Sequence, residues 1–136
     1  MTKEEKQLLL KDLCGRLPYG TICRCRTTED STWWNTDHRI FGIIGNKVDV
    51  GSDIIDAEQI KPYLRPLSSM TEEEKIELCT IAYAPDEMKT IEEKLHVVKT
   101  NAKNAADFYN EHHFDHRGLI PIGLALEAPE GMYKTK

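Results

Sequence analysis

The stretch Arg39-Ile40-Phe41-Gly42-Ile43-Ile44-Gly45-Asn46-Lys47-Val48-Asp49-Val50 decides the fold class of this 136-residue chain. It holds two short runs of apolar and β-branched residues, 39–44 and 47–50, and the Gly45-Asn46 pair between them is a turn signal. Strands joined by so short a connection pair in the antiparallel direction. The stretch therefore predicts two antiparallel strands, and Gly51-Ser52-Asp53 ends the second of them.

One more strand precedes this pair, within residues 19–26. Its residues alternate, so that Arg24 and Arg26 face one side while Cys23 and Cys25 face the other. Residues 27–37 are polar and acidic apart from two tryptophans, which predicts a loop or an irregular hairpin connection. Three short strands so close in sequence predict an antiparallel meander or a small open barrel.

Helical patterns lie on both sides of the β region. Residues 2–5 form a capping box of Thr and Glu before a row of leucines at helical spacing, which predicts a helix over residues 3–16. A second capping box, from Thr71 to Glu74, predicts a helix over residues 72–83.

The C-terminal half is less regular. Residues 86–100 fit either a helix or a strand, and residues 101–113 fit a helix with Tyr109 on its apolar face. Residues 118–133 combine three Gly and two Pro with several Leu and Ile. This mixture predicts an irregular segment that packs over the core, because so many apolar residues would not be left in a free tail.

These elements predict an α+β fold in a single domain, residues 1–136. We expect an N-terminal helix, a small antiparallel sheet of three to four strands, two or three helices, and the packed irregular C-terminal segment. An extended connector or edge strand with Pro62 and Pro66 divides a helix-plus-β subregion, 1–66, from a helical subregion, 67–136. The residues expected in the core are Leu9, Leu13, Ile22, Phe41, Ile43, Val48, Leu64, Ile76, Tyr109 and Leu119.

Composition excludes several classes of protein. The chain is 40% hydrophobic and 30% charged with a formal net charge of −5, which is typical of a soluble globular domain. No apolar run approaches the roughly 18 residues of a membrane span, and the charged N-terminus differs from a signal peptide, so we expect a cytoplasmic protein without membrane contact. No segment is strongly basic, which argues against nucleic acid as the partner. Nucleotide- and calcium-binding motifs are absent from the sequence, so no cofactor is expected.

The densest group of reactive side chains is Glu111-His112-His113-Phe114-Asp115-His116-Arg117. If a helix continued through it, His112 and His116 would share a face at a spacing that zinc ligands use. His112, His113, Asp115 and His116 are therefore the candidate ligands of a metal site. The alternative is that the helix ends here, where histidines interact favourably with the helix dipole and cap free carbonyl groups.

Trp33 and Trp34, together with Arg24, Arg26 and Arg39, form the candidate binding surface. Adjacent residues of a strand face opposite sides, so one tryptophan is expected to be exposed, and exposed aromatic residues mark binding surfaces. Single-stranded nucleic acid could stack on such a surface of Trp and Arg. The alternative is that one tryptophan fills the core while the other shields a loop.

The remaining reactive residues favour no catalytic role. Cys23 and Cys25 could supply half of a metal site, but no second Cys or His pair stands at zinc-finger spacing. Small buried hydrophobic side chains, reduced inside the cell, are the favoured interpretation of these cysteines. Ser69 lacks the Gly-x-Ser-x-Gly context of a nucleophile and suits the lead-in to a helix. No catalytic residue is therefore assigned.

Three stretches carry a resemblance to other proteins: LCGRLPYG at residues 13–20, KPYLRPLSSMTEEE at residues 61–74, and HFDHRGLI at residues 113–120 with the following GLA and EAPEGMY. They cover about a third of the chain and resemble a family of small proteins encoded by bacteria and by their phages or mobile elements. The resemblance implies a cytoplasmic accessory protein of phage origin and brings no activity, cofactor or catalytic residue. Other members carry Tyr at the position of His116, which weighs against a metal site that uses it.

The sequence thus favours a small non-enzymatic accessory protein that binds another protein. The contact would use the β surface around Trp33-Trp34 or the acidic surface around residues 53–77. Seven acidic and three basic residues within 51–83 give that segment a charge of −4. A metal-dependent hydrolase or nuclease built on the histidine group, and a single-stranded nucleic-acid-binding module, are the alternatives. Neither the identity of the partner nor the oligomeric state follows from the sequence.

Overall fold

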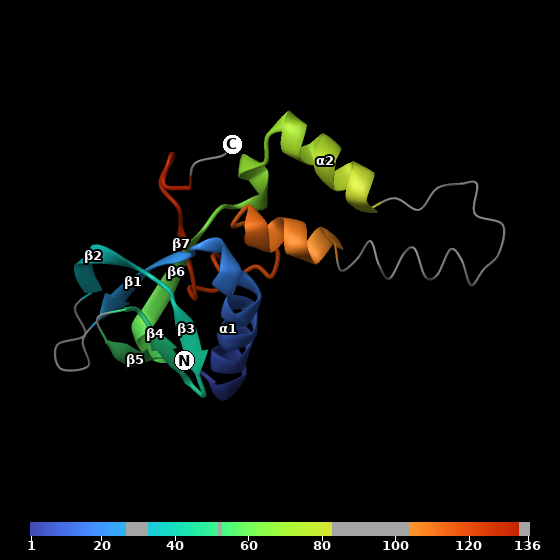
Figure 1. The fold of residues 1–136 in the computed structure, drawn as a ribbon. Helices are drawn as coiled ribbons and strands as arrows, with labels where there is room; N and C mark the ends of the chain where they lie inside the picture. Colours follow the sequence, from blue (N-terminus) through green and yellow to red (C-terminus); the bar gives the residue numbers. More distant parts are fainter. Residues whose placement is uncertain (27–32, 52, 83–103, 134–136) are drawn as a thin grey trace, which may run out of the picture.

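The computed structural model describes residues 1–26, 33–51, 53–82 and 104–133, and it confirms the α+β class (Figure 1). One long helix packs against two small sheets. Two further helices, α2 (Glu72–Ala82) and the helix of residues 104–111, lie at one end of the molecule. None of the helices in the described part of the chain is long and apolar enough to cross a bilayer.

Helix α1 (Lys3–Arg16) forms as predicted. The Thr2 hydroxyl accepts a hydrogen bond from the Glu5 amide at 3.1 Å, and the Glu5 carboxylate accepts one from the Thr2 amide at 2.9 Å. This capping box satisfies two amides that have no partner inside the helix. Leu9 and Leu13 point from α1 into the core, where both are fully buried.

The larger sheet has the strand order β2-β1-β6-β7. Strand β1 pairs antiparallel with β2 and β6, and β7 pairs parallel with β6. The bounds of these strands are β1 (Ile22–Arg26), β2 (Trp33–Arg39), β6 (Ile60–Leu64) and β7 (Leu126–Glu127). The loop predicted over residues 27–37 is therefore wrong for residues 33–37, where pairing with β1 overrides a polar local sequence; residues 27–32 lie outside the described part.

The smaller sheet has the order β3-β4-β5, all antiparallel. Its strands are β3 (Gly42–Ile44), β4 (Lys47–Asp49) and β5 (Ile54–Asp56), and the Gly45-Asn46 pair connects the first two as predicted.

One bent strand joins the two sheets. The Ile40 amide donates to the Thr21 carbonyl at 2.9 Å, next to β1, whereas the Phe41 amide donates to the Asp49 carbonyl at 2.8 Å in β4. The chain thus changes partner between two consecutive residues. If β2 and β3 are counted as one bent strand, the antiparallel strands follow the order β6-β1-β2/β3-β4-β5, and the 3-10 helix η2 (Ala57–Gln59) precedes β6. A fold does not by itself define a function, so function has to be argued from a site.

The proline-rich stretch that was expected to connect two halves of the chain is a strand of the larger sheet. Pro62 in β6 lies in register with Cys23 of β1, and Tyr63 pairs on the opposite side with Leu126 of β7. β6 is therefore an interior strand at this level, extended as predicted but neither a free connector nor an edge strand. The sequence signal was ambiguous because proline disfavours a helix and an interior strand alike.

The C-terminal segment packs across the core as predicted. Phe114 forms an isolated parallel bridge with Arg65, directly after β6. Leu119 and Leu124 belong to the central hydrophobic cluster, although Ile122 is 51% exposed.

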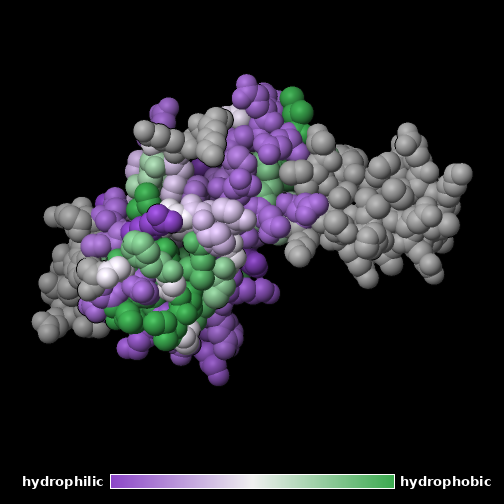
Figure 2. Space-filling model, viewed as in Figure 1, coloured by the Kyte–Doolittle hydropathy of each residue, from purple (hydrophilic) through white to green (hydrophobic). Residues whose placement is uncertain are grey.

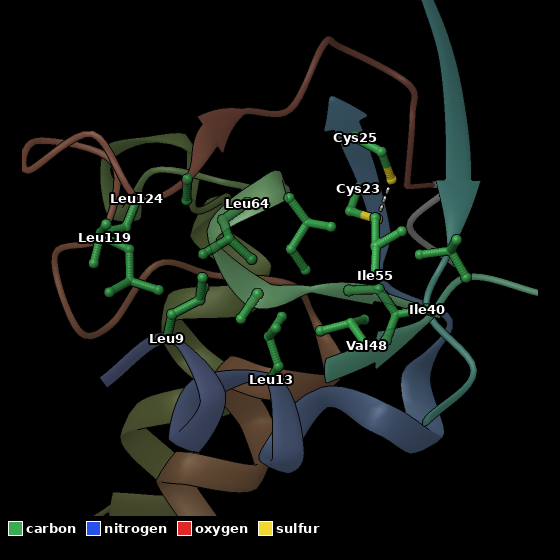
Figure 3. Packing of buried hydrophobic residues seen from close by; sticks show 14 residues of the cluster. Leu9, Leu13, Cys23, Cys25, Ile40, Val48, Ile55, Leu64, Leu119 and Leu124 are labelled. Atoms are coloured by element: carbon green, nitrogen blue, oxygen red, sulfur yellow. Dashed lines mark hydrogen bonds between the residues drawn. The ribbon is translucent and has the colours of Figure 1, made fainter. Parts of the chain in front are cut away.

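The core lies between α1, the two sheets and the C-terminal segment (Figure 3). Five of the expected core residues are buried, namely Leu9, Leu13, Val48, Leu64 and Leu119. Ile22 and Ile43 are half-buried.

Two core expectations are wrong. Phe41 is 60% exposed at the bend between the sheets, and Ile76 is 66% exposed on α2. Tyr109 is half-buried, like Ile22 and Ile43, while its neighbour Phe108 is 3% exposed. The large aromatic side chain of Phe108 is therefore the one that the helix of residues 104–111 buries most completely.

Candidate functional site

The candidate β surface is described only in part. Arg24 and Arg26 lie on one face of β1, and Arg39 of β2 is paired with Ile22 of β1. The Arg24 guanidinium lies 5.6 Å from the centre of the Tyr63 ring and its Nε is 3.7 Å from the Asp37 carboxylate. The backbone of Trp33 and Trp34 belongs to β2, but their side chains lie outside the described residues, so the binding role of this surface stays a prediction.

The histidine group does not continue the helix. The helix of residues 104–111 ends before His112, so His112 and His116 do not share a helical face. His112 Nδ1 lies 3.4 Å from Glu74, whereas His116 Nε2 lies 3.2 Å from the Asn110 side-chain oxygen. The expectation that the helix stops here is confirmed.

Asp115 has a structural role in this turn. Its carboxylate accepts hydrogen bonds from the amides of Leu119 and Ile120 at 2.8 and 2.9 Å. In the described part of the chain, no group of three or more His, Cys, Asp or Glu side chains is placed to hold a metal ion.

His113 adopts an unusual backbone conformation at the end of this helix. Its φ is 63°, the one non-glycine residue in the described part with a positive φ. The His113 amide donates to the Asn110 carbonyl, and the Phe114 amide donates to the Tyr109 carbonyl at 2.8 Å. This left-handed helix end is the position where glycine is usual. A residue that is less suited to the backbone is typical of a site where the side chain matters.

The His113 side chain is buried against Tyr133. The two rings are stacked, with centroids 3.6 Å apart and planes within 10°. His113 is 8% exposed, and its Nδ1 has no hydrogen-bond partner in the structure. Burial, together with the nearby charge of Arg16, lowers the pKa of His113 to about 4. The imidazole is therefore neutral at pH 7.

A cavity of about 510 Å³ opens beside this ring pair, between α2, the turn after residue 111 and the C-terminal segment. Figure 2 shows hydrophilic side chains over α2, next to this region. The cavity is lined by Tyr19, Arg65, Thr71, Glu73, Glu74, Glu77, Glu111, His112, His113 and Tyr133. Four of these ten residues are glutamates and one is an arginine, so these five residues give the lining a formal charge of −3.

A second cavity of about 710 Å³ adjoins the first. Both are lined by Arg65, Thr71 and Tyr133, and the second adds Glu127 and Glu130 of the C-terminal segment. The two cavities are here called the acidic cleft.

Arg65 does not neutralise the exposed carboxylates of the acidic cleft, because its charge is already paired with the Glu74 carboxylate. Its guanidinium donates to both Glu74 carboxylate oxygens at 2.9 and 2.8 Å, and it lies 4.2 Å from the centre of the Phe114 ring. The hydrogen bonds from Arg65, helped by the Thr71 amide, lower the pKa of Glu74 to about 2. Thr71 and Glu74 also form the predicted capping box of α2, with hydrogen bonds of 3.0 and 3.1 Å.

Tyr133 fixes the other wall of the acidic cleft. Its hydroxyl accepts from the Ile22 amide at 2.9 Å and donates to the Tyr63 carbonyl at 2.8 Å. The side chain therefore ties the C-terminal segment to β1 and β6. Burial raises the pKa of Tyr133, so the hydroxyl stays protonated and keeps both hydrogen bonds.

The exposed carboxylates of the acidic cleft suit a positively charged group. Glu73, Glu77 and Glu111 are exposed at the cleft, and none of the three forms an ion pair with Lys or Arg in the described structure. Exposed carboxylates around a partly apolar cavity attract positively charged groups. Among the described residues that line the two cavities, the histidines are His112 and His113.

The sequence contained two signals for this site. The predicted acidic contact surface around residues 53–77 includes Glu73, Glu74 and Glu77, and the histidine group includes His112 and His113, all of which line the cavity. Arg65 and Tyr133 gave no signal, because their partners are distant in the chain. No protein family, curated protein or solved structure matches this chain in the comparisons with known proteins.

Proposed function

We propose that this chain is a non-enzymatic interaction protein that binds a basic segment of a partner protein in the acidic cleft. The observation that carries the proposal is the combination of exposed glutamates with the buried, neutral His113 at one cavity. The glutamates supply charge complementarity to Lys and Arg side chains. The ring pair of His113 and Tyr133 supplies a flat apolar wall, of the kind on which long basic side chains pack.

Two further features support binding rather than catalysis. The walls of the cleft are held by internal contacts, since Arg65 is locked by Glu74 and Tyr133 by its two backbone partners. A preorganised cleft binds at a lower entropic cost than one that must order itself. The resemblance to small bacterial and phage-encoded proteins also favours an accessory protein that acts on another protein in the cytoplasm.

The test is a titration of the full chain with labelled nine-residue peptides that are basic, neutral or acidic, followed by fluorescence anisotropy. We expect the basic peptides to bind and the others not, and we expect the affinity to fall as salt rises from about 50 to 300 mM because exposed charges are screened. A chain that binds no basic peptide at the lower salt concentration overturns the proposal.

Matched variants locate the contact. The double variant Glu73→Gln, Glu77→Gln removes two charges from the acidic cleft, and Glu58→Gln, Glu72→Gln removes two exposed charges elsewhere. We expect the first pair to weaken binding at least about tenfold, which corresponds to about 1.4 kcal/mol. The second pair should change affinity by less than about twofold. Equal losses of affinity in the two double variants would show a general charge effect and contradict binding in the acidic cleft.

A further inference from the structure

The acidic cleft has the features of a site for one particular side chain. We propose that it selects arginine over lysine in the partner, with the guanidinium stacked on the His113–Tyr133 ring pair and bonded to the cleft glutamates. This inference rests on the proposed function, and it adds a chemical identity to the ligand. Three observations carry it.

The first observation is how this protein holds its own arginine at the same place. The Arg65 guanidinium lies 4.2 Å from the centre of the Phe114 ring and donates hydrogen bonds to both carboxylate oxygens of Glu74. A ring below and a carboxylate at the edge are the two contacts that a planar guanidinium makes and an ammonium makes less well. The acidic cleft beside Arg65 presents the same two kinds of group, aromatic rings and carboxylates.

The second observation is the ring pair. His113 and Tyr133 are stacked with nearly parallel planes, and both line the 510 Å³ cavity. Tyr133 also lines the adjoining cavity, so a side chain that crosses from one cavity to the other passes this tyrosine. The His113 ring is neutral, which leaves it without the charge that would repel a cation.

The third observation is that His113 has an unfavourable backbone conformation and an unfavourable environment. Its backbone is left-handed, its ring is 8% exposed, and its Nδ1 is buried without a hydrogen-bond partner. Glycine would fit this helix end with less strain, and a buried imidazole nitrogen without a partner is unfavourable. A side chain kept under these conditions beside a cavity is more consistent with a contact to a ligand than with a contribution to stability.

The carboxylates complete the site. Glu77 and Glu111 lie on α2 and on the helix of residues 104–111, so they approach the cavity from two elements. The Glu77 side chain is 56% exposed, and its carboxylate lies 4.0 Å from His112 Nε2. Carboxylates from two directions match the several N–H donors of a guanidinium.

The experiment compares nine-residue peptides that differ at one central residue: Arg, Lys or citrulline, with two flanking Lys kept in all three. We expect the Arg peptide to bind at least about tenfold more tightly than the Lys peptide, and citrulline, which has the shape without the charge, to bind more weakly than Lys. Equal affinity for Arg and Lys overturns the selection of arginine while leaving the proposed function intact. Failure of all three peptides overturns both.

Agmatine, a free guanidinium compound, tests whether the guanidinium group comes from an arginine side chain of a protein or from a small molecule. If agmatine binds as tightly as the Arg peptide, the assignment to a side chain of a protein is overturned. We expect it to bind at least about tenfold more weakly, because it lacks the backbone and flanking contacts.

The variant His113→Asn tests the ring, because asparagine tolerates a left-handed backbone. The matched control is His116→Asn, because the ring of His116 stacks on Tyr109 and not in the cleft. We expect His113→Asn to reduce the ratio of Arg to Lys affinity to about two or less, with a far-ultraviolet circular dichroism spectrum like that of the parent, and His116→Asn to keep the ratio. A folded His113→Asn variant with an unchanged ratio overturns the role of this ring.

Discussion

Removing the carboxylate of Asp12 should destabilise this protein more than any surface substitution. Asp12 and Arg16 both have fully buried side chains, and Arg16 Nε and Nη2 donate to the two Asp12 oxygens at 2.7 and 3.1 Å. Arg16 Nη2 also donates to the Phe114 carbonyl at 2.6 Å, and Arg117 Nε lies 3.3 Å from Asp12. One carboxylate thus balances a guanidinium that has no access to water.

The expected magnitude follows from this burial. The variant Asp12→Ala leaves Arg16 buried and charged without its counter-ion, and breaking a buried pair in this way costs about 3–5 kcal/mol. Such a loss is a large part of the 5–15 kcal/mol that typically stabilises a domain. The variant Asp12→Asn, which keeps the volume and part of the hydrogen bonding, should lose less than Asp12→Ala.

Urea denaturation at 25 °C and pH 7, followed by circular dichroism, measures the loss as a change in the free energy of unfolding. The double variant Asp12→Ala, Arg16→Met removes both charges, so it should be more stable than Asp12→Ala alone. The control is Glu72→Ala, whose exposed ion pair with Lys75 should contribute less than about 1 kcal/mol. A loss below about 1 kcal/mol in Asp12→Ala, or a double variant less stable than the single one, would refute the reasoning.

Three further outcomes are expected. The hydrogen bonds from Arg65 lower the pKa of Glu74 to about 2 from its ordinary 4.5. The stability that this pair contributes is therefore complete above pH 4.5 and is lost as the pH falls towards 2. In the variant Glu74→Gln, the free energy of unfolding should fall less steeply over this acid range. Tyr133→Phe leaves a backbone amide and a carbonyl without their partner and should cost about 1–3 kcal/mol in urea denaturation. Iodoacetamide should modify the exposed Cys14 and Cys79 of the native chain within minutes and reach the two buried thiols of β1 only after unfolding, which mass spectrometry of timed samples resolves.

The structure also shows why the two thiols of β1 favour the interpretation as buried side chains. Cys23 and Cys25 point to the same side of the strand, with sulfur atoms 3.8 Å apart, and both are fully buried in the core (Figure 3). Period-two alternation in the sequence was enough to predict their common face. That this face is the core face depends on distant segments of the chain that pack into the same hydrophobic cluster.

The elements that the sequence predicted well depend on neighbours a few residues away. Thr2 caps α1 through Glu5, and Thr71 caps α2 through Glu74, each over three residues. The turn at Gly45-Asn46 connects β3 and β4 in the same local way. Such contacts join residues that are close in the sequence, so residue pattern and propensity are sufficient to predict them.

The acidic cleft depends on contacts that no local pattern contains. Tyr133 bonds to Ile22 across 111 residues, and Arg16 bonds to Phe114 across 98. The same long-range packing turned the proline-rich stretch into an interior strand and left Phe41 exposed at a bend. The sequence by itself therefore determined the α+β class and the N-terminal ends of α1 and α2, because those ends follow from hydrogen bonds within one turn. Only the tertiary structure decided which charged and aromatic side chains meet at a cavity, because that depends on how distant segments share one core.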